Sequence, residues 1–172
     1  MRHRISLIAV TLLMIASLAL AQSSKSKMAA HSNMKGHDSH VIMSADEVKW
    51  GPAPPSLPPG AQAAIIDGDP SKAGSSFTIR LKAPDGYKVP PHWHPVAEHV
   101  TVLEGTFVLG TGDKFDESAG KEMGVGAFAS MPKGVRHFAW AKGETIIQVH
   151  GIGPFELIYV NPADDPRKKM SH

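Results

Sequence analysis

The chain has 172 residues, of which 42% are hydrophobic, and its 18 basic residues nearly balance 16 acidic ones. This size and composition predict one globular domain with extensions. The charge balance gives no reason to bind nucleic acid or an anionic membrane, since both need clustered positive charge, and the absence of cysteine excludes disulfides and thiolate metal sites.

The N-terminal residues are typical of a secretory signal peptide. Arg2 and Arg4 precede a weakly polar to apolar run, Ile5 to Leu20, and small residues surround the predicted cleavage site after Ala21. We expect a signal peptide over residues 1–21 and a periplasmic or secreted protein. A retained membrane anchor is the alternative, but the run is shorter than the ~20 apolar residues that span a bilayer. Cleavage would remove two of the 18 basic residues and none of the 16 acidic ones, leaving no net charge.

Residues 22–62 form a predicted flexible arm followed by a stiff strap. The methionines and histidines of the arm are Met28, His31, Met34, His37, His40 and Met43. Such a series can sequester copper, although short polar arms also collect these residues by drift. Five prolines from Pro52 to Pro59 favour an extended polyproline conformation in the strap.

From about residue 63 the sequence changes to short β-branched or alternating runs separated by turn residues. Examples are SFTIRL, HVTVL and TFVLG, of which the last two are separated by a predicted turn at Glu104 and Gly105. Many short strands at this spacing predict a β-sandwich or small β-barrel over residues 63–160. Helix is expected only in the signal peptide and near Ser44 to Val48, and residues 161–172 form a charged tail.

Two histidines and a glutamate stand close together in this segment. In a strand His92 and His94 point to the same face, so two imidazoles converge, while Pro95 lets the chain reverse and Glu98 returns a carboxylate to that point. Further on, His137 begins another strand. Three imidazoles and one carboxylate suit Mn, Fe, Ni, Cu or Zn and not Ca or Mg.

The spacing of these residues forms two motifs. The first is Gly86, His92, His94, Glu98 and Gly105, and the second is Gly126, Pro132, Gly134 and His137. Both resemble the conserved motifs of the cupin superfamily, specifically a small single-domain secreted member. The asparagine that often ends the second motif is replaced by Ala141, which is not a ligand position in the family. The resemblance implies an all-β fold with one cupin barrel, a double-stranded β-helix or jelly roll, and one divalent metal held by the three histidines and the glutamate.

Other candidates are weaker. Gln148 and His150 share a strand face, and they would be candidate catalytic residues if that face were the barrel interior; a satisfied or exposed polar pair is the alternative. His99 is expected at the surface. The aromatic residues expected in the core or pocket wall are Tyr87, Phe107, Phe128, Phe138 and Trp140.

The cupin resemblance implies two classes of function. One is a mononuclear metal-dependent enzyme for a small oxygen-bearing molecule, with dioxygenase, oxalate-type or isomerase chemistry; the other is a non-catalytic module that binds a metal or small ligand. Because His3 separates Arg2 from Arg4, the twin-arginine signature is absent, and metal would load outside the cytoplasm. Fe, Mn or Cu is favoured over Zn or Ni, and a homodimer through a sheet edge is expected.

Overall fold

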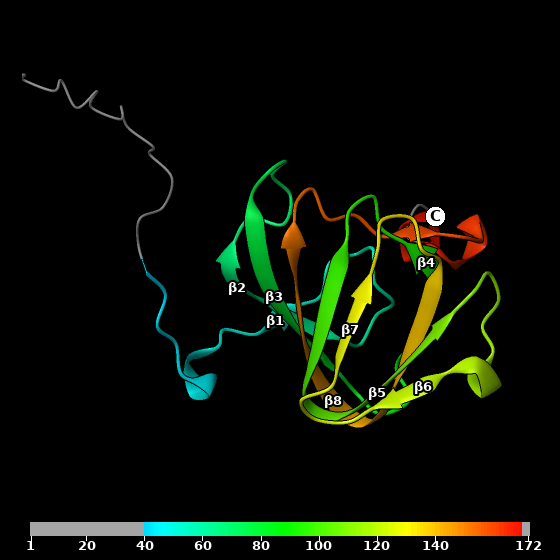
Figure 1. Ribbon diagram of the computed structural model, residues 1–172, viewed down its shortest axis with the longest axis horizontal. Helices are drawn as coiled ribbons and strands as arrows, with labels where there is room; N and C mark the ends of the chain where they lie inside the picture. Colours follow the sequence, from blue (N-terminus) through cyan, green and yellow to red (C-terminus); the bar gives the residue numbers. More distant parts are fainter. Residues whose placement is uncertain (1–39, 170–172) are drawn as a thin grey trace, which may run out of the picture. The chain divides into compact units, whose positions relative to one another are not determined.

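The computed structural model describes residues 40–169, so the predicted signal peptide and most of the predicted arm lie outside the described residues. Strands dominate this part of the chain, which confirms the all-β prediction (Figure 1). The strands are β1 (Gly51–Pro52), β2 (Gln62–Gly68), β3 (Ser76–Ala83), β4 (Lys88–Trp93), β5 (Glu98–Thr111), β6 (Lys121–Met123), β7 (Phe128–Met131), β8 (His137–Ile152) and β9 (Ile158–Tyr159). No helix within residues 40–169 is long and apolar enough to cross a membrane.

In the described part of the chain, four short helical turns accompany the strands: η1 (Ala45–Glu47), η2 (Glu117–Ala119), η3 (Pro162–Asp164) and α1 (Pro166–Lys169). The first lies where a brief helix was predicted. The other three were missed, although two carry a recognisable start signal. Asp116 and Asn161 each accept a hydrogen bond from the backbone N–H two residues later, which caps η2 and η3.

The strands form one curled antiparallel sheet in the order β1-β2-β3-β8-β4-β9, and β5 pairs with β6, β7 and β8. The two longest strands, β5 and β8, pair along most of their length, from His99 opposite His150 to Thr111 opposite His137. Both β5 and β8 bend sharply along their length. The first and second halves of each strand therefore lie on opposite sides of the space that the sheet encloses (Figure 1).

The turn predicted at Glu104 and Gly105 is wrong, because β5 continues through these residues with a bulge. The pairing register with β8 shifts on either side of Glu104, and Gly105 has φ +73°. Val100 and Val102 point inward before the bulge, whereas Phe107 and Leu109 point inward after it, so the bulge changes which alternate residues face the core. Only glycine fits here, since a Cβ would overlap the carbonyl oxygen of Glu144.

We expect Gly105→Ala to lower the free energy of unfolding by at least about 2 kcal/mol, from the positive φ and the backbone overlap together. Gly143→Ala is the matched control, because Gly143 has a similar φ of +74° but no atom within 4 Å of an added Cβ. Its expected cost is about 1 kcal/mol. Urea unfolding of both variants measures the difference, and equal costs would contradict a steric role for the Glu144 carbonyl.

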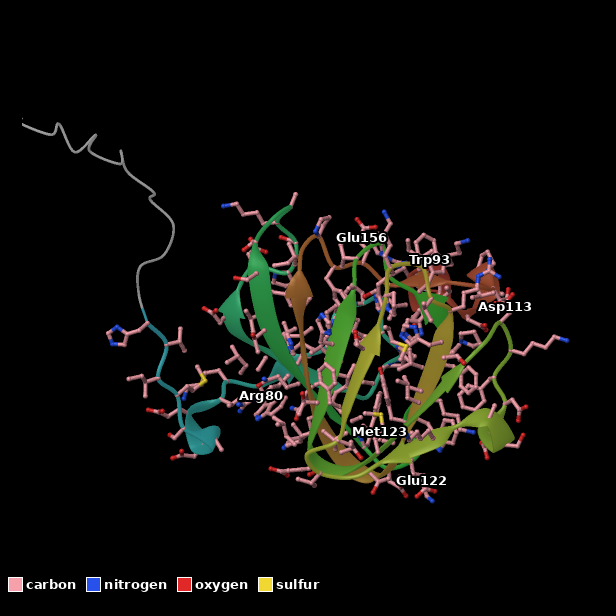
Figure 2. All side chains as sticks on the ribbon, viewed as in Figure 1. Arg80, Trp93, Asp113, Glu122, Met123 and Glu156 are labelled. Carbon is pink, nitrogen blue, oxygen red and sulfur yellow. The ribbon has the colours of Figure 1, made fainter. Side chains whose placement is uncertain are left out.

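The core fills the space inside the curled sheet. Its buried members are Phe77, Val100, Val102, Phe107, Leu109, Met123, Ala139, Ile147 and Val149. Figure 2 shows side chains filling this region, with Met123 inside and its neighbour Glu122 at the lower edge. This alternation is what a sheet with one buried face requires.

The proline-rich strap, residues 53–61, packs against the sheet through two tyrosines. The Tyr87 hydroxyl donates to the carbonyl of Pro58 at 2.6 Å, and the Tyr159 hydroxyl donates to the carbonyl of Ser56 at 2.8 Å. The strap closes on itself where Ala53 N–H donates to Ala61. These contacts place the strap beside the cavity described below.

Candidate metal centre

Three strand ends bring the predicted ligands together. His92 lies near the end of β4 and His94 just beyond it, while Glu98 begins β5 and His137 begins β8. His92 and His137 are paired across β4 and β8. The β4–β8 register shifts between Val89 and His92, where two prolines interrupt the pairing because they have no N–H to donate. All four predicted side chains are buried, with exposed fractions of 8% or less.

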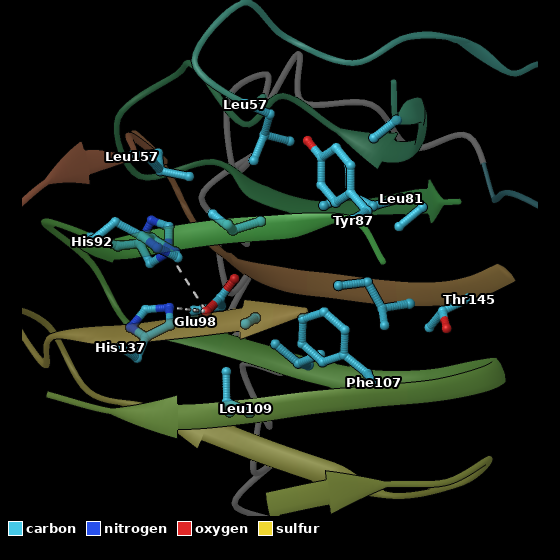
Figure 3. Close-up of a pocket in the computed structure, with 17 residues that line it drawn as sticks. Leu57, Leu81, Tyr87, His92, Glu98, Phe107, Leu109, His137, Thr145 and Leu157 are labelled. Carbon is cyan, nitrogen blue, oxygen red and sulfur yellow. Dashed lines mark ion pairs between the residues drawn. The ribbon is translucent and has the colours of Figure 1, made fainter. Parts of the chain in front are cut away.

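The donor atoms of these side chains converge, as Figure 3 shows. The ligand atoms of His92, His94 and His137 lie within 4.8 Å of one another. One carboxylate oxygen of Glu98 is 3.2 Å from His137 Nε2 and 3.6 Å from His94 Nε2. A single ion can therefore contact the three histidines, and the Glu98 carboxylate lies beside two of them, His94 and His137.

Backbone carbonyls fix the orientation of each imidazole. The Nδ1 atom of His92 lies 2.7 Å from the Pro90 carbonyl, that of His94 lies 2.7 Å from Glu156, and that of His137 lies 3.0 Å from Val135. Because a carbonyl only accepts, each Nδ1 carries the hydrogen and each Nε2 faces the shared point. Nε2 of His94 is buried without a hydrogen-bond partner among the described residues, so a metal would satisfy it.

The electrostatics favour neutral imidazoles at His92 and His94 beside a charged carboxylate at Glu98. Burial lowers the pKa of His92 to about 3 and also lowers the pKa of His94. Burial raises the pKa of Glu98, but the hydrogen bond from His137 and the nearby histidines outweigh it, so the net shift is downward. At His137, burial lowers the pKa, but the hydrogen bond to Glu98 and the charge of Glu98 outweigh it, so the net shift is upward and a metal would displace the Nε2 proton. Neutral imidazole and ionised carboxylate are the forms that bind metals. The donor set therefore fits one borderline divalent ion.

A cavity of about 60 Å³ extends from these residues into the barrel. Its other lining residues are Leu57, Ala61, Leu81, Ala83, Tyr87, Val89, Val100, Phe107, Leu109, Ala139, Thr145, Ile147 and Leu157. Only Tyr87 and Thr145 carry polar groups. Both hydroxyls are directed at backbone carbonyls, those of Pro58 for Tyr87 and of Thr106 and Gly143 for Thr145. The cavity is thus apolar except at the metal centre.

Gln148 and His150 do not line the cavity. The inward residues of this part of β8 are Ile147 and Val149, so the alternation of the strand turns Gln148 and His150 to the outer face. Gln148 accepts a hydrogen bond from Arg80 Nε at 3.2 Å, which makes it a satisfied polar residue. The hypothesis that these two side chains act beside the metal is therefore corrected.

The aromatic residues divide between the two faces of the sheet. Tyr87 and Phe107 line the cavity, as predicted for a pocket wall, and Phe138 is fully buried on the other face. Phe128 is 58% exposed, so its prediction as a core residue is wrong. Sequence reasoning also missed Phe155, whose ring stacks on His94 with centroids 4.3 Å apart. The sequence contains little indication of this contact, because the residues around Phe155 form no regular strand.

Comparison with known proteins agrees with this architecture. Residues 40–167 match the family described as Domain of unknown function (DUF4437). No protein with a curated description matches the sequence.

Among solved structures, the polyketide cyclase RemF from Streptomyces resistomycificus is 18% identical with a TM-score of 0.58, covering 78% of this chain and 94% of its own. A "putative acetylacetone dioxygenase" from Methylibium petroleiphilum PM1 is 18% identical with a TM-score of 0.56, covering 74% and 85%. An RmlC-like cupin from Shewanella frigidimarina NCIMB 400 is 14% identical with a TM-score of 0.51, covering 67% and 94%. These similarities show the cupin fold.

Proposed function

We propose that this chain, which belongs to the family described as Domain of unknown function (DUF4437), is a metal-dependent cupin enzyme acting on a small oxygen-bearing molecule with an apolar body. The buried donor set of His92, His94, His137 and Glu98 supports the metal. A redox-capable divalent ion such as Fe, Mn or Cu would supply Lewis-acid polarisation of substrate oxygens and electron transfer.

The proposed class of substrate is inferred from the composition of the cavity wall. Apart from the metal ligands, its side chains are apolar or have hydroxyls directed at backbone carbonyls. Substrate oxygens would therefore bind at the metal centre, while the carbon body packs on residues such as Phe107 and Ile147. No Lys or Arg within residues 40–169 lines the cavity, so a dianion such as oxalate would lack a second cationic partner there. This favours dioxygenase chemistry on a neutral or singly charged compound.

The residues that cover the cavity would orient the substrate and exclude water. Burial raises the pKa of Tyr87, so its hydroxyl stays protonated and remains a donor to the strap. Leu57 and Leu157 cover the cavity beside the metal centre (Figure 3). The expulsion of water would strengthen electrostatic interactions at the metal.

An oxygen-uptake screen tests this proposal. The full chain would be loaded separately with Fe, Mn, Cu or Zn and offered small β-diketones, phenols and monocarboxylates, with oxalate for comparison. Acetylacetone is a suitable first compound, because it combines two oxygens with a small apolar body and the Methylibium neighbour is named for it. We expect oxygen uptake with at least one redox metal and a β-diketone or phenol. No turnover with any metal and compound would contradict the enzyme proposal.

The alternative is a non-catalytic cupin that holds a metal or a small ligand. The outward orientation of Gln148 and His150 favours it, since no acid or base among the described residues lines the cavity beyond the metal ligands and Tyr87. Ligand binding without turnover, measured by calorimetry on the metal-loaded chain, would support this alternative.

The size limit of the cavity gives a further prediction. Leu57→Trp is expected to retain stoichiometric metal but to reduce turnover at least ~10-fold, because a larger side chain would enter a cavity of about 60 Å³. Leu57→Met is the control, because it nearly conserves volume. Metal analysis and oxygen uptake on the same preparations distinguish a blocked cavity from a damaged metal centre; unchanged turnover in Leu57→Trp would remove Leu57 from the substrate site.

We also propose that the protein is exported and that the mature chain begins at Gln22. The basic start, apolar run and small residues before the cleavage point support this. Mass analysis of the exported protein is expected to give an N-terminus at Gln22. An intact segment from Arg2 to Leu20 on that protein would indicate a membrane anchor instead.

The proposed assembly is a homodimer formed through a sheet edge. Edge strands carry unpaired backbone groups, so joining two edges satisfies them. Light scattering on the metal-loaded chain gives the oligomeric state, and a monomer at all concentrations would contradict the proposal.

A further inference from the structure

The outer face of the sheet, opposite the cavity, has a row of polar side chains that the metal centre does not use. The pairing register brings Thr78 of β3, His150 of β8, His99 of β5 and Ser130 of β7 side by side. His99 and His150 are direct cross-strand partners at the centre of this row. The sequence alone did not indicate this pairing, because 50 residues separate His99 from His150.

The two imidazoles are close and nearly parallel. Their ring centroids are 5.0 Å apart with an interplanar angle of 24°, and Phe128 stacks on His99 at 5.9 Å. The centroids of the three histidines in the barrel are separated by 4.2 to 5.2 Å, a spacing similar to that of the outer pair. Those rings are tilted against one another by 41 to 81°, so the outer rings must turn toward each other to direct one nitrogen each at a shared ion. No nitrogen of either ring has a hydrogen-bond partner within residues 40–169.

Solvent reaches both rings. His99 and His150 are half-buried and line an open groove of about 640 Å³ on this face. The groove also contains the exposed side chain of Lys133, which opposes cation binding, so any ion must be held by the imidazoles themselves.

We propose that His99 and His150 form a second metal site that binds copper(II) through both imidazoles at the protein surface. Directly opposed residues on neighbouring strands have Cβ atoms about 5 Å apart, which lets two rings contact one ion. Copper(II) binds imidazole most strongly among the common divalent metals and accepts a square arrangement with water in the remaining positions. This site does not depend on the proposed enzyme activity, because Glu98 and His99 point to opposite sides of β5.

The copper(II) complex of nitrilotriacetate is a suitable probe. Its bulk prevents entry into a buried cavity of about 60 Å³, so the probe reports only surface sites. EPR titration would compare the full wild-type chain with His99→Phe, His150→Phe and the double variant. Phenylalanine keeps a ring in the stack but removes the donor nitrogens. We expect each single variant to bind one copper(II) ion at least ~10-fold more weakly than the wild type. Once one imidazole has bound the ion, the second donor acts at a high effective concentration, and either substitution removes this advantage.

The pattern across variants decides the proposal. If both rings hold one ion, the double variant loses no more copper(II) affinity than either single variant. The His40→Ala and His94→Ala variants are expected to keep the wild-type affinity of the surface site. His40 tests one histidine of the arm, deletion of residues 22–43 tests the whole arm, and His94 tests the barrel. Wild-type binding in both single variants, or losses that add in the double variant, would overturn the shared site.

Discussion

The His94→Ala variant is expected to purify without stoichiometric metal, whereas the wild-type chain is expected to carry one divalent ion. Nε2 of His94 is buried, lacks a hydrogen-bond partner among the described residues and faces Glu98. Loss of an outer partner of a ligand commonly reduces metal affinity 10- to 100-fold, so loss of the ligand itself is expected to cost more than ~100-fold. Elemental analysis per chain, after a chelating resin has removed weakly held ions, measures the effect.

His40→Ala is the control for this experiment, because His40 is exposed and lies outside the barrel. Circular dichroism would check that the His94 variant keeps its strands. His137→Ala should behave in the same way, since its Nε2 lies 3.2 Å from Glu98. Full metal retention in both folded variants would exclude these four side chains as the metal centre.

Phe138→Ala is expected to lower the free energy of unfolding by about 3 to 5 kcal/mol, the usual cost of removing a buried phenylalanine ring. Phe138 has an exposed fraction of 0%, and its ring lies 5.0 Å from Phe115 and 6.3 Å from Trp140 between centroids. Gly110 leaves the space that the ring occupies, because a Cβ there would overlap it. The residual cavity would be difficult for these rigid neighbours to fill.

Phe128→Ala is the matched control for Phe138, because Phe128 is 58% exposed. Its expected cost is below about 1 kcal/mol, as for most surface substitutions. Chemical denaturation measures both. Equal losses would mean that burial on the outer face of β8 contributes little to stability.

The Phe138 variant should also bind metal less tightly, because the substitution adjoins His137 on the same strand.

Much of the metal centre was predictable because its signals are local. His92 and His94 are two residues apart, Pro95 turns the chain, and Glu98 follows within one short reversal. The structure brings these three residues to His137. The cupin resemblance supplied the position of His137, whose distance from Glu98 in the sequence gives no direct indication of contact.

The outer positions of Gln148 and His150 were also within reach of the sequence. Inward residues of β8 are odd-numbered from His137 through Ala139 to Ile147 and Val149. This alternation would have excluded both candidates if β8 had been recognised as one strand through Gly143. On β5, by contrast, the bulge at Gly105 reverses the alternation, and no local pattern specifies such a shift.

The strap was beyond sequence reasoning for a different reason. Its prolines predict an extended chain but not what it packs against, and its anchors come from Tyr87 and Tyr159, 29 and 103 residues away from their partners in the sequence. Leu57 therefore gave no sign that it would line the cavity.

The two tyrosine contacts that hold the strap join neutral hydroxyls to neutral carbonyls. Dissolved salt screens charges but has little effect on hydrogen bonds between uncharged groups. The attachment of the strap through these two contacts is therefore expected to depend little on ionic strength. We expect the strap to stay in place in dilute and in saline surroundings alike, whereas a strap held by ion pairs would loosen as the salt concentration rises.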